Sequence, residues 1–277
     1  MHWNPILIKE MRTRMRGKLA FFVLTTYVFV LSGVILLYFL GTRGAPPAVF
    51  NQAGFWLTFV LMIVQMVLIC LVAPTFSASA ISSEREQETF DLLVASLARP
   101  STIVVGKVGA ALSYLLVILL GSMPVVALAY SLGGVALRDL AISYLLMLVA
   151  CIAFCSISFL WSCVIRRGVM AIMMSLVSVF FLVVVLPLLG LAFMGLTVNF
   201  GGGGGPSQTV VNIVFLMLRI NPFASIAYLL IPGIPKPQGL WLSGIPFWVS
   251  QMLFYLTLTA LSLFLSIKRL KRVRNWI

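Results

Sequence analysis

Residues 71–100 read LVAPTFSASAISSEREQETFDLLVASLARP, and in this segment an acidic stretch follows directly on an apolar run. Glu84, Glu86, Glu88 and Asp91 are four of the six acidic residues in the chain, and they lie within eight positions. Long apolar runs flank the segment on both sides. Charged side chains are costly in hydrocarbon, so the segment is predicted to lie in water at one face of a membrane.

The composition indicates a membrane protein. The chain has 277 residues, of which 62% are hydrophobic and 9% are charged, whereas soluble domains have about 45–50% and about 25%. The net charge of +13 does not indicate a nucleic-acid partner, because the basic residues lie at the ends of apolar runs, where they contact anionic lipid. The predicted class is a multi-pass protein of the lipid membrane.

Six apolar runs are long enough to cross about 30 Å of hydrocarbon as helices. They cover residues 19–40, 55–76, 104–131, 140–165, 169–196 and 247–267. For the first run a signal peptide is the alternative, but its apolar core would have only about 7–15 residues. The predicted fold is therefore an all-α membrane protein with six transmembrane helices.

Three further segments are predicted outside the spans. Residues 1–18 mix basic and apolar residues, which is typical of an interfacial helix, and Lys9, Glu10 and Arg12 belong to its polar face. Residues 197–246 contain two apolar runs, at 210–218 and 223–231, that are too short to cross. We expect them to form two short helices or a re-entrant hairpin on the outer surface.

The acidic segment itself is predicted to form a helix over residues 80–99. Ser83 followed by Glu86 fits the S-x-x-E capping box, which would start a helix there. Leu92, Leu93 and Leu97 then place an apolar stripe on the helix, and Arg99-Pro100 ends it.

The distribution of basic residues predicts the orientation. Fifteen lysines and arginines lie in the two termini and in the second and fourth loops, while Arg43, Arg138, Arg219 and Lys236 lie on the other side. By the positive-inside rule both termini and the 80–99 helix are cytoplasmic. The expected location is the plasma membrane, specifically a bacterial inner membrane.

The spans carry little that could do chemistry. No ionisable residue lies in the interior of any proposed span when Lys107 is counted with the second loop, which argues against a proton relay or an ion-coupled carrier. Cys151 and Cys155 are four positions apart and share a helix face. The two alternatives for them are a metal or redox pair and ordinary packing residues. Without a neighbouring His or carboxylate, packing is favoured.

No catalytic, cofactor-binding or metal-binding residue is therefore predicted. The spans also lack the residue sets that an intramembrane protease would need. Gln65 and the prolines Pro124 and Pro187, which are expected to kink their helices, are the candidate wall residues of a translocation route. Ordinary helix packing is the alternative for each of them. The phosphate-binding pattern G-x-x-x-x-G-K-[ST] is also missing, because Gly106-Lys107 is followed by Val108 and Gly17-Lys18 by Leu19. The chain is thus expected not to be an enzyme, and its energy to come from a partner.

Several motifs resemble those of ABC-2 type permease subunits. NPILIKEMR at residues 4–12 is similar to the opening of that family, and residues 81–100 with Val105-Gly106-Lys107 are similar to its cytoplasmic signature. RINPF at residues 219–223 resembles its asparagine-proline motif before the last span. Glu88 departs from the pattern, since many members have glycine before the threonine.

The resemblance implies a pair of permease subunits, identical or different, each bound to an ABC ATPase subunit that holds ATP and Mg. Residues 80–99 would be the coupling helix, with Ser83, Glu84, Glu86, Glu88, Phe90, Asp91, Leu92 and Leu93 as its partner-binding residues.

The function that follows is an ATP-driven exporter of apolar or amphipathic cargo. The alternatives are a membrane scaffold or assembly protein that transports nothing, and an energy-independent carrier or scramblase. An ATPase rate that responds to cargo would separate the exporter from both.

Overall fold

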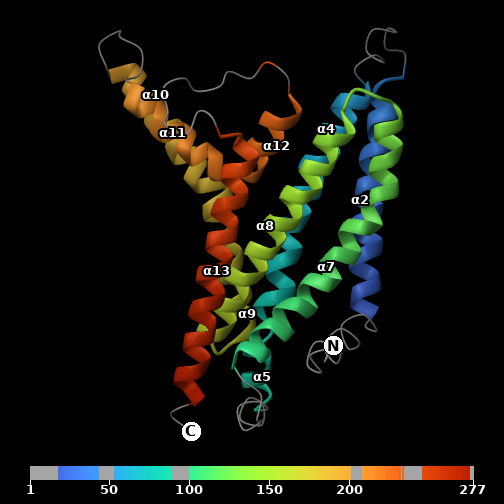
Figure 1. The fold of residues 1–277 in the computed structure, drawn as a ribbon. Coiled ribbons are helices and arrows are strands. Elements are labelled where there is room, and N and C mark those ends of the chain that lie inside the picture. The colour runs from blue at the N-terminus through green and yellow to red at the C-terminus, as the bar shows by residue number, and fades with distance from the viewer. Residues whose placement is uncertain are drawn as a thin grey trace.

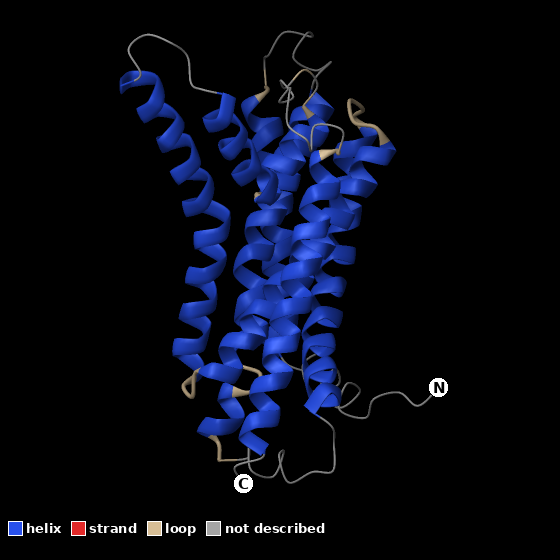
Figure 2. Cartoon of the chain, turned by 60° about the vertical axis from the view of Figure 1, so that its left-hand side comes forward, coloured by secondary structure: helices blue, strands red, loops and turns tan. Residues whose placement is uncertain are grey.

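The fold is known from a computed structural model that describes residues 18–43, 53–88, 100–200, 208–231, 233 and 245–274. Helices joined by short loops make up this part of the chain, and it contains no strand (Figure 2). Helix is the expected outcome, because lipid offers no hydrogen-bond partners and a helix satisfies its backbone groups within the segment.

Six helical segments are long and apolar enough to cross a membrane, as predicted. They are α2 (Lys18–Gly41), α4 (Ala53–Ala78), α7 (Pro100–Ser131), α8 (Leu137–Val164), a composite fifth span and α13 (Phe247–Arg274). The fifth span consists of α9 (Gly168–Phe180), the π-helix η1 (Phe181–Val185) and α10 (Leu186–Phe200). The shorter helices are α5 (Ser82–Glu86), α11 (Gln208–Ile220) and α12 (Pro222–Leu230).

Helix α8 is the centre of the bundle and packs against α4, α7, α9, α12 and α13. Small buried residues let neighbouring helices approach it closely, and Cys151, Cys155 and Cys163 are among them as free thiols. This agrees with the packing role predicted for Cys151 and Cys155. In the described part of the chain, no three His, Cys, Asp or Glu side chains are grouped closely enough to hold a metal ion.

The turn between α7 and α8 is packed against the start of α4. Gly133 and Gly134 have φ of +84° and +94°, a conformation that glycine adopts without steric cost. At Gly54 a Cβ atom would lie 2.0 Å from the Gly133 carbonyl oxygen. Only glycine at position 54 allows this backbone-to-backbone contact, which joins α4 to the α7–α8 turn.

A polar cluster lies inside the bundle. The Gln65 amide donates to the Ser122 hydroxyl, which lies 3.3 Å from the Tyr144 hydroxyl. Gln65 is fully buried, so the structure places it in the core between α4, α7 and α8. This finding argues against Gln65 as the wall of an open route.

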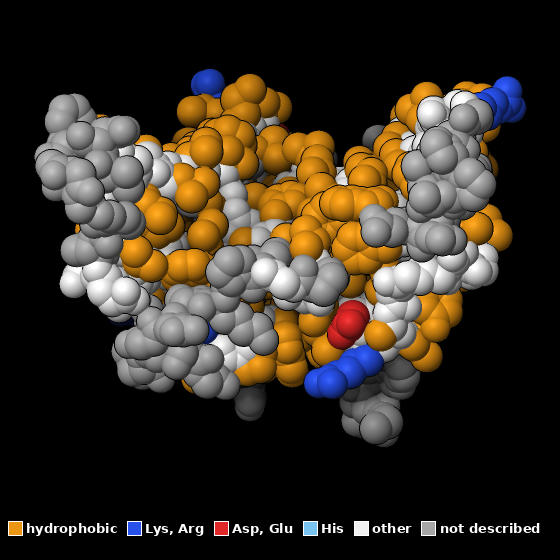
Figure 3. Space-filling model, turned by 90° about the horizontal axis from the view of Figure 1, so that it is seen from above, with side chains coloured by type: hydrophobic (Ala, Val, Ile, Leu, Met, Phe, Trp, Pro, Cys, Tyr) orange, Lys and Arg blue, Asp and Glu red, His pale blue; other side chains and the backbone are white. Residues whose placement is uncertain are grey.

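The two ends of the bundle differ. Helix α5 lies at the end where α2 begins and α13 finishes, and α11 and α12 lie at the opposite end (Figure 1). These two short helices are bent by 97° relative to each other, as expected for short runs that do not cross separately. Viewed from that end, the described surface is mostly hydrophobic and charged side chains appear at few points (Figure 3).

Candidate coupling site

Helix α5 continues the direction of the chain after α4, but the two helices are separated by a turn at residues 79–81. The turn leaves backbone groups that need partners. The Ser162 hydroxyl of α8 accepts from the Ile81 and Ser82 N–H groups at 2.8 and 3.0 Å. One side chain of the central helix therefore holds the break between α4 and α5.

A partly buried ion pair joins α5 to α7. The Lys107 ammonium donates to the Glu84 carboxylate at 2.7 Å and to the Ala80 carbonyl at 3.0 Å. The Lys107 side chain is 3% exposed and that of Glu84 is 24% exposed. Water screens such a pair only weakly, and the contact directs Glu84 Oε1 at Lys107 of α7.

This geometry corrects one prediction. Lys107 was assigned to the second loop, but α7 begins at Pro100 and Lys107 lies two turns inside it. Glu84 was predicted to bind a partner subunit, which stays a prediction, and within the chain its Oε1 binds Lys107. The lysine is therefore an ionisable residue inside a span, which the sequence had indicated to be absent.

Glu86 joins α5 to the start of α9. Its carboxylate accepts from the Gly168 N–H at 3.0 Å, and a carboxylate is favourable at a helix N-terminus because of the helix dipole. A Cβ at position 168 would lie 3.1 Å from Glu86 Oε2, so glycine leaves room for the contact. Through Glu84, Glu86 and Ser162, α5 is bonded to α7, α9 and α8.

The predicted start and length of the 80–99 helix are wrong for its described part. Ser83 does not cap the helix, because its hydroxyl donates to the Ser79 carbonyl and Ile81 before it already has helical backbone angles. Helix α5 ends at Glu86, and Glu88 follows with φ of +57°. Residues 89–99 lie outside the described part of the chain, Phe90, Asp91, Leu92 and Leu93 included.

Glu88 has a backbone conformation that suits glycine. The left-handed region costs a non-glycine residue roughly 1–2 kcal/mol. We expect Glu88→Gly to raise the free energy of unfolding by about 0.5–1 kcal/mol, measured as a higher thermal midpoint of the purified protein. Gln87→Gly, one residue earlier at negative φ, is the control and should lower the midpoint.

The interfacial helix predicted over residues 1–18, with Lys9, Glu10 and Arg12, lies almost entirely outside the described residues, since only Lys18 at the start of α2 is described. Its role stays a prediction.

A second site lies in the fifth span, where the π-helix precedes Pro187. Proline has no N–H, so the Val183 carbonyl four residues earlier loses its α-helical partner. The Asn221 side-chain amide donates to this carbonyl at 2.8 Å. The α-helix is therefore interrupted before Pro187 by a π-helix, and the free Val183 carbonyl has a partner from outside the span.

Asn221 also starts α12. Its side-chain oxygen accepts from the N–H groups of Phe223 at 2.8 Å and Ala224 at 3.4 Å, and Pro222 follows at the first helical position, which proline favours. The asparagine-proline motif thus serves two elements, since one amide caps α12 and pairs with η1. Sequence reasoning noted the motif but not the pairing.

Arg219, two residues before Asn221, lies 4.7 Å from the centre of the Phe247 ring. Phe247 in turn stacks on Tyr228 at 4.0 Å. The guanidinium is buried among α11, α12 and α13, where a cation over an aromatic face is stabilised. Arg219 was counted as a loop charge, but it is part of the packing between these helices.

The three candidate wall residues occupy different environments. Gln65 is in the core, Pro124 is exposed on α7, and Pro187 is buried behind the π-turn. The structure describes an apolar cavity of about 460 Å³ elsewhere, between α4, α9, η1 and α12. Its lining comprises Val67, Cys70, Leu71, Leu176, Val177, Val179, Phe180, Val183, Val184 and Phe223.

Comparison with known proteins identifies the family. A search of curated protein sequences finds no match to the chain. A family model described as ABC-2 family transporter protein matches residues 4–273, nearly the whole length. The match includes the six spans, the α5 contacts and the asparagine-proline motif. This chain therefore belongs to the ABC-2 family of transporter proteins, as a multi-pass permease subunit of an ABC transporter.

Proposed function

We propose that the protein is the permease subunit of an ATP-driven exporter, powered by a separate ABC ATPase subunit that binds ATP and Mg. Under this proposal α5 and residues 89–99 face the cytoplasm and contact the ATPase, and α11 and α12 face outward. A second permease subunit completes the complex in the plasma membrane.

The observation that carries the proposal is the attachment of α5. A short helix at the membrane surface is bonded to three spans through Glu84, Glu86 and Ser162. A push on α5 would therefore move α7, α8 and α9 together. A scaffold that only binds partners has no need for such a linkage, and neither does an energy-independent carrier.

The proposed cargo is apolar or amphipathic. The cavity between α4, α9 and η1 is lined by apolar residues, several of which are exposed at the outside of the bundle, such as Leu71 and Phe180. Such a lining suits a hydrophobic ligand that enters from the bilayer. The cavity also lies beside Val183, the carbonyl partner of Asn221, where a change in the π-turn would alter its shape.

The test is to reconstitute the permease with its ATPase subunit in vesicles and measure ATP hydrolysis and efflux of an apolar dye. Ser162→Ala removes the acceptor at the α4–α5 break with the loss of a single oxygen atom. Because two N–H groups lose a partner, we expect cargo-stimulated hydrolysis and efflux to fall roughly tenfold or more, with the ATPase subunit still bound.

Ser178→Ala is the matched control. The Ser178 hydroxyl is on α9 and accepts from the Trp161 indole N–H rather than from a group of α5. It should leave stimulation within about twofold of the unmodified protein. Normal efflux by Ser162→Ala would contradict coupling through α5, and stimulation only by a small, highly charged solute would contradict the proposed cargo.

A further inference from the structure

A concave site lies between the ends of α8 and α13, at the same end of the bundle as α5 (Figure 1). Its volume is about 410 Å³, and its lining residues are Leu160, Trp161 and Val164 of α8 with Leu265, Lys268, Arg269 and Arg272 of α13. The α13 residues are spaced i, i+3, i+4 and i+7 and so share one helix face. We call this the α8–α13 pocket.

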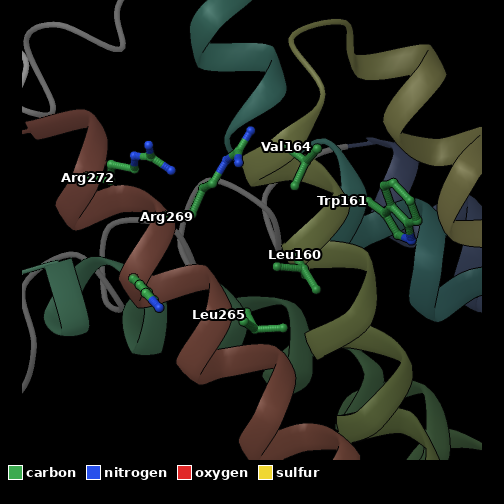
Figure 4. Close-up of a pocket in the computed structure, with 7 residues that line it drawn as sticks. Leu160, Trp161, Val164, Leu265, Arg269 and Arg272 are labelled. Atoms are coloured by element: carbon green, nitrogen blue, oxygen red, sulfur yellow. The ribbon is translucent and has the colours of Figure 1, made fainter.

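The pocket has two chemically different halves (Figure 4). Leu160 and Leu265 face each other from the two helices, and Arg269 and Arg272 extend from α13 one to two turns further along. The Trp161 indole N–H donates to Ser178 of α9 at 2.8 Å, and the ring lies on the side of α8 away from Arg269 and Arg272 (Figure 4). The result is an apolar floor below a basic rim.

The rim has an excess of positive charge. None of the seven lining residues is acidic, and Arg85 lies close enough to Arg166 and Arg269 to experience repulsion from both. Of the described carboxylates of α5, Glu84 binds Lys107 and Glu86 binds the Gly168 N–H, while Glu88 follows the helix and is exposed. The rim therefore favours an anion, and arginine pairs can bind phosphate oxygens bidentately.

The depth of the pocket indicates the source of that anion. Leu160 to Val164 form the last turn of α8, and Leu265 precedes the basic residues by one turn of α13. The floor is thus at the edge of the hydrocarbon and the rim is at the level of the lipid headgroups. A water-soluble protein segment could reach the rim but not the floor, whereas a phospholipid reaches both.

From these contacts we infer that the α8–α13 pocket binds one anionic phospholipid, with its phosphate between Arg269 and Arg272 and an acyl chain against Leu160 and Leu265. Basic pockets between transmembrane helices are suited to such headgroups. This site is separate from the cargo cavity between α4 and α9, and its occupancy requires no ATP.

The test uses the purified full-length chain in a neutral detergent, titrated with phosphatidylglycerol and read by native mass spectrometry and by thermal midpoint. The pocket variant is Arg269→Gln with Arg272→Gln. Each basic residue near an anionic headgroup contributes roughly fivefold to binding, so the dissociation constant should rise roughly thirtyfold. Arg269→Lys with Arg272→Lys keeps the charge but loses the bidentate geometry. Its dissociation constant should lie between those of the unmodified protein and the glutamine variant.

The matched control is Arg167→Gln with Lys271→Gln, which removes the same charge at the same end from exposed residues outside the pocket. Its dissociation constant should change less than about threefold. Phosphatidylcholine and free glycerol phosphate should stabilise the unmodified protein much less than phosphatidylglycerol, because one lacks the net charge and the other lacks the chains.

Three results would overturn the inference. The first is equal binding of phosphatidylglycerol by the pocket and control variants. The second is equal stabilisation by glycerol phosphate, which would indicate a site for free anions. The third is unchanged lipid binding by the pocket variant together with lost assembly with the ATPase subunit, which would assign the rim to an acidic protein segment. None of these readouts depends on transport.

Discussion

Glu84→Ala is expected to destabilise the protein more than any other single change at α5. It leaves the Lys107 ammonium, 3% exposed, without its carboxylate partner. Breaking a buried ion pair from one side costs about 3–5 kcal/mol, and the partial exposure of Glu84 places the expected loss near 3 kcal/mol in unfolding free energy. The measurement is the denaturation midpoint of the purified protein in detergent.

Replacing both partners tests the cause. Glu84→Leu with Lys107→Met removes both charges and keeps side-chain volume, so it should recover most of the stability lost in Glu84→Ala. Glu86→Ala is the matched control, since it removes a neighbouring carboxylate that only caps α9, and should cost about 1 kcal/mol. If Glu84→Ala costs no more than Glu86→Ala, the Lys107 pair is not what fixes α5.

Asn221→Ala is expected to have the second large effect, because one side chain serves two elements. Loss of the α12 cap costs about 0.5–2 kcal/mol, and the unpaired Val183 carbonyl about 1–3 kcal/mol. We expect a total loss of about 2–4 kcal/mol with impaired transport. Asn212→Ala on α11, whose partner Gln208 is exposed, should stay within about 0.5 kcal/mol.

Pro187→Ala separates the two contributions. It supplies an N–H four residues after Val183. This N–H can donate to the Val183 carbonyl in place of the Asn221 amide once the π-helix relaxes to an α-helix. In the Asn221→Ala background it should therefore restore about 1–3 kcal/mol, leaving only the cap loss. Equal effects of Pro187→Ala in both backgrounds would show that residues 187 and 221 do not act on the same carbonyl.

The sequence was sufficient for the six spans because each carries its signal within about 20 residues. It was not sufficient for contacts between spans. Lys107 and Glu84 are 23 positions apart, and only the packing of α7 beside α4 brings them together. A lysine two turns past Pro100, with apolar neighbours on both sides, nevertheless indicates a charge inside a span.

Local motifs were ambiguous for a different reason. Ser83 and Glu86 have the spacing of a capping box, but that spacing only places two side chains near one helix turn. Helix α5 begins at Ser82, one residue before Ser83. The Ser83 hydroxyl therefore bonds backward to the Ser79 carbonyl, and Glu86 reaches Gly168 instead of the start of its own helix. Likewise, Pro187 predicts that the Val183 carbonyl lacks its helical partner. It does not predict that Asn221, 38 positions after Val183, pairs with that carbonyl.

The length of α4 gives its contact with α5 a mechanical meaning. With 26 residues at about 1.5 Å each, the helix is about 39 Å long, so a tilt of about 10° about its α5 end would displace the far end by ~7 Å. That far end holds Gly54 in backbone contact with Gly133, where no flexible side chain absorbs the movement. A tilt of α4 at its α5 end would thus be transmitted directly to the α7–α8 turn.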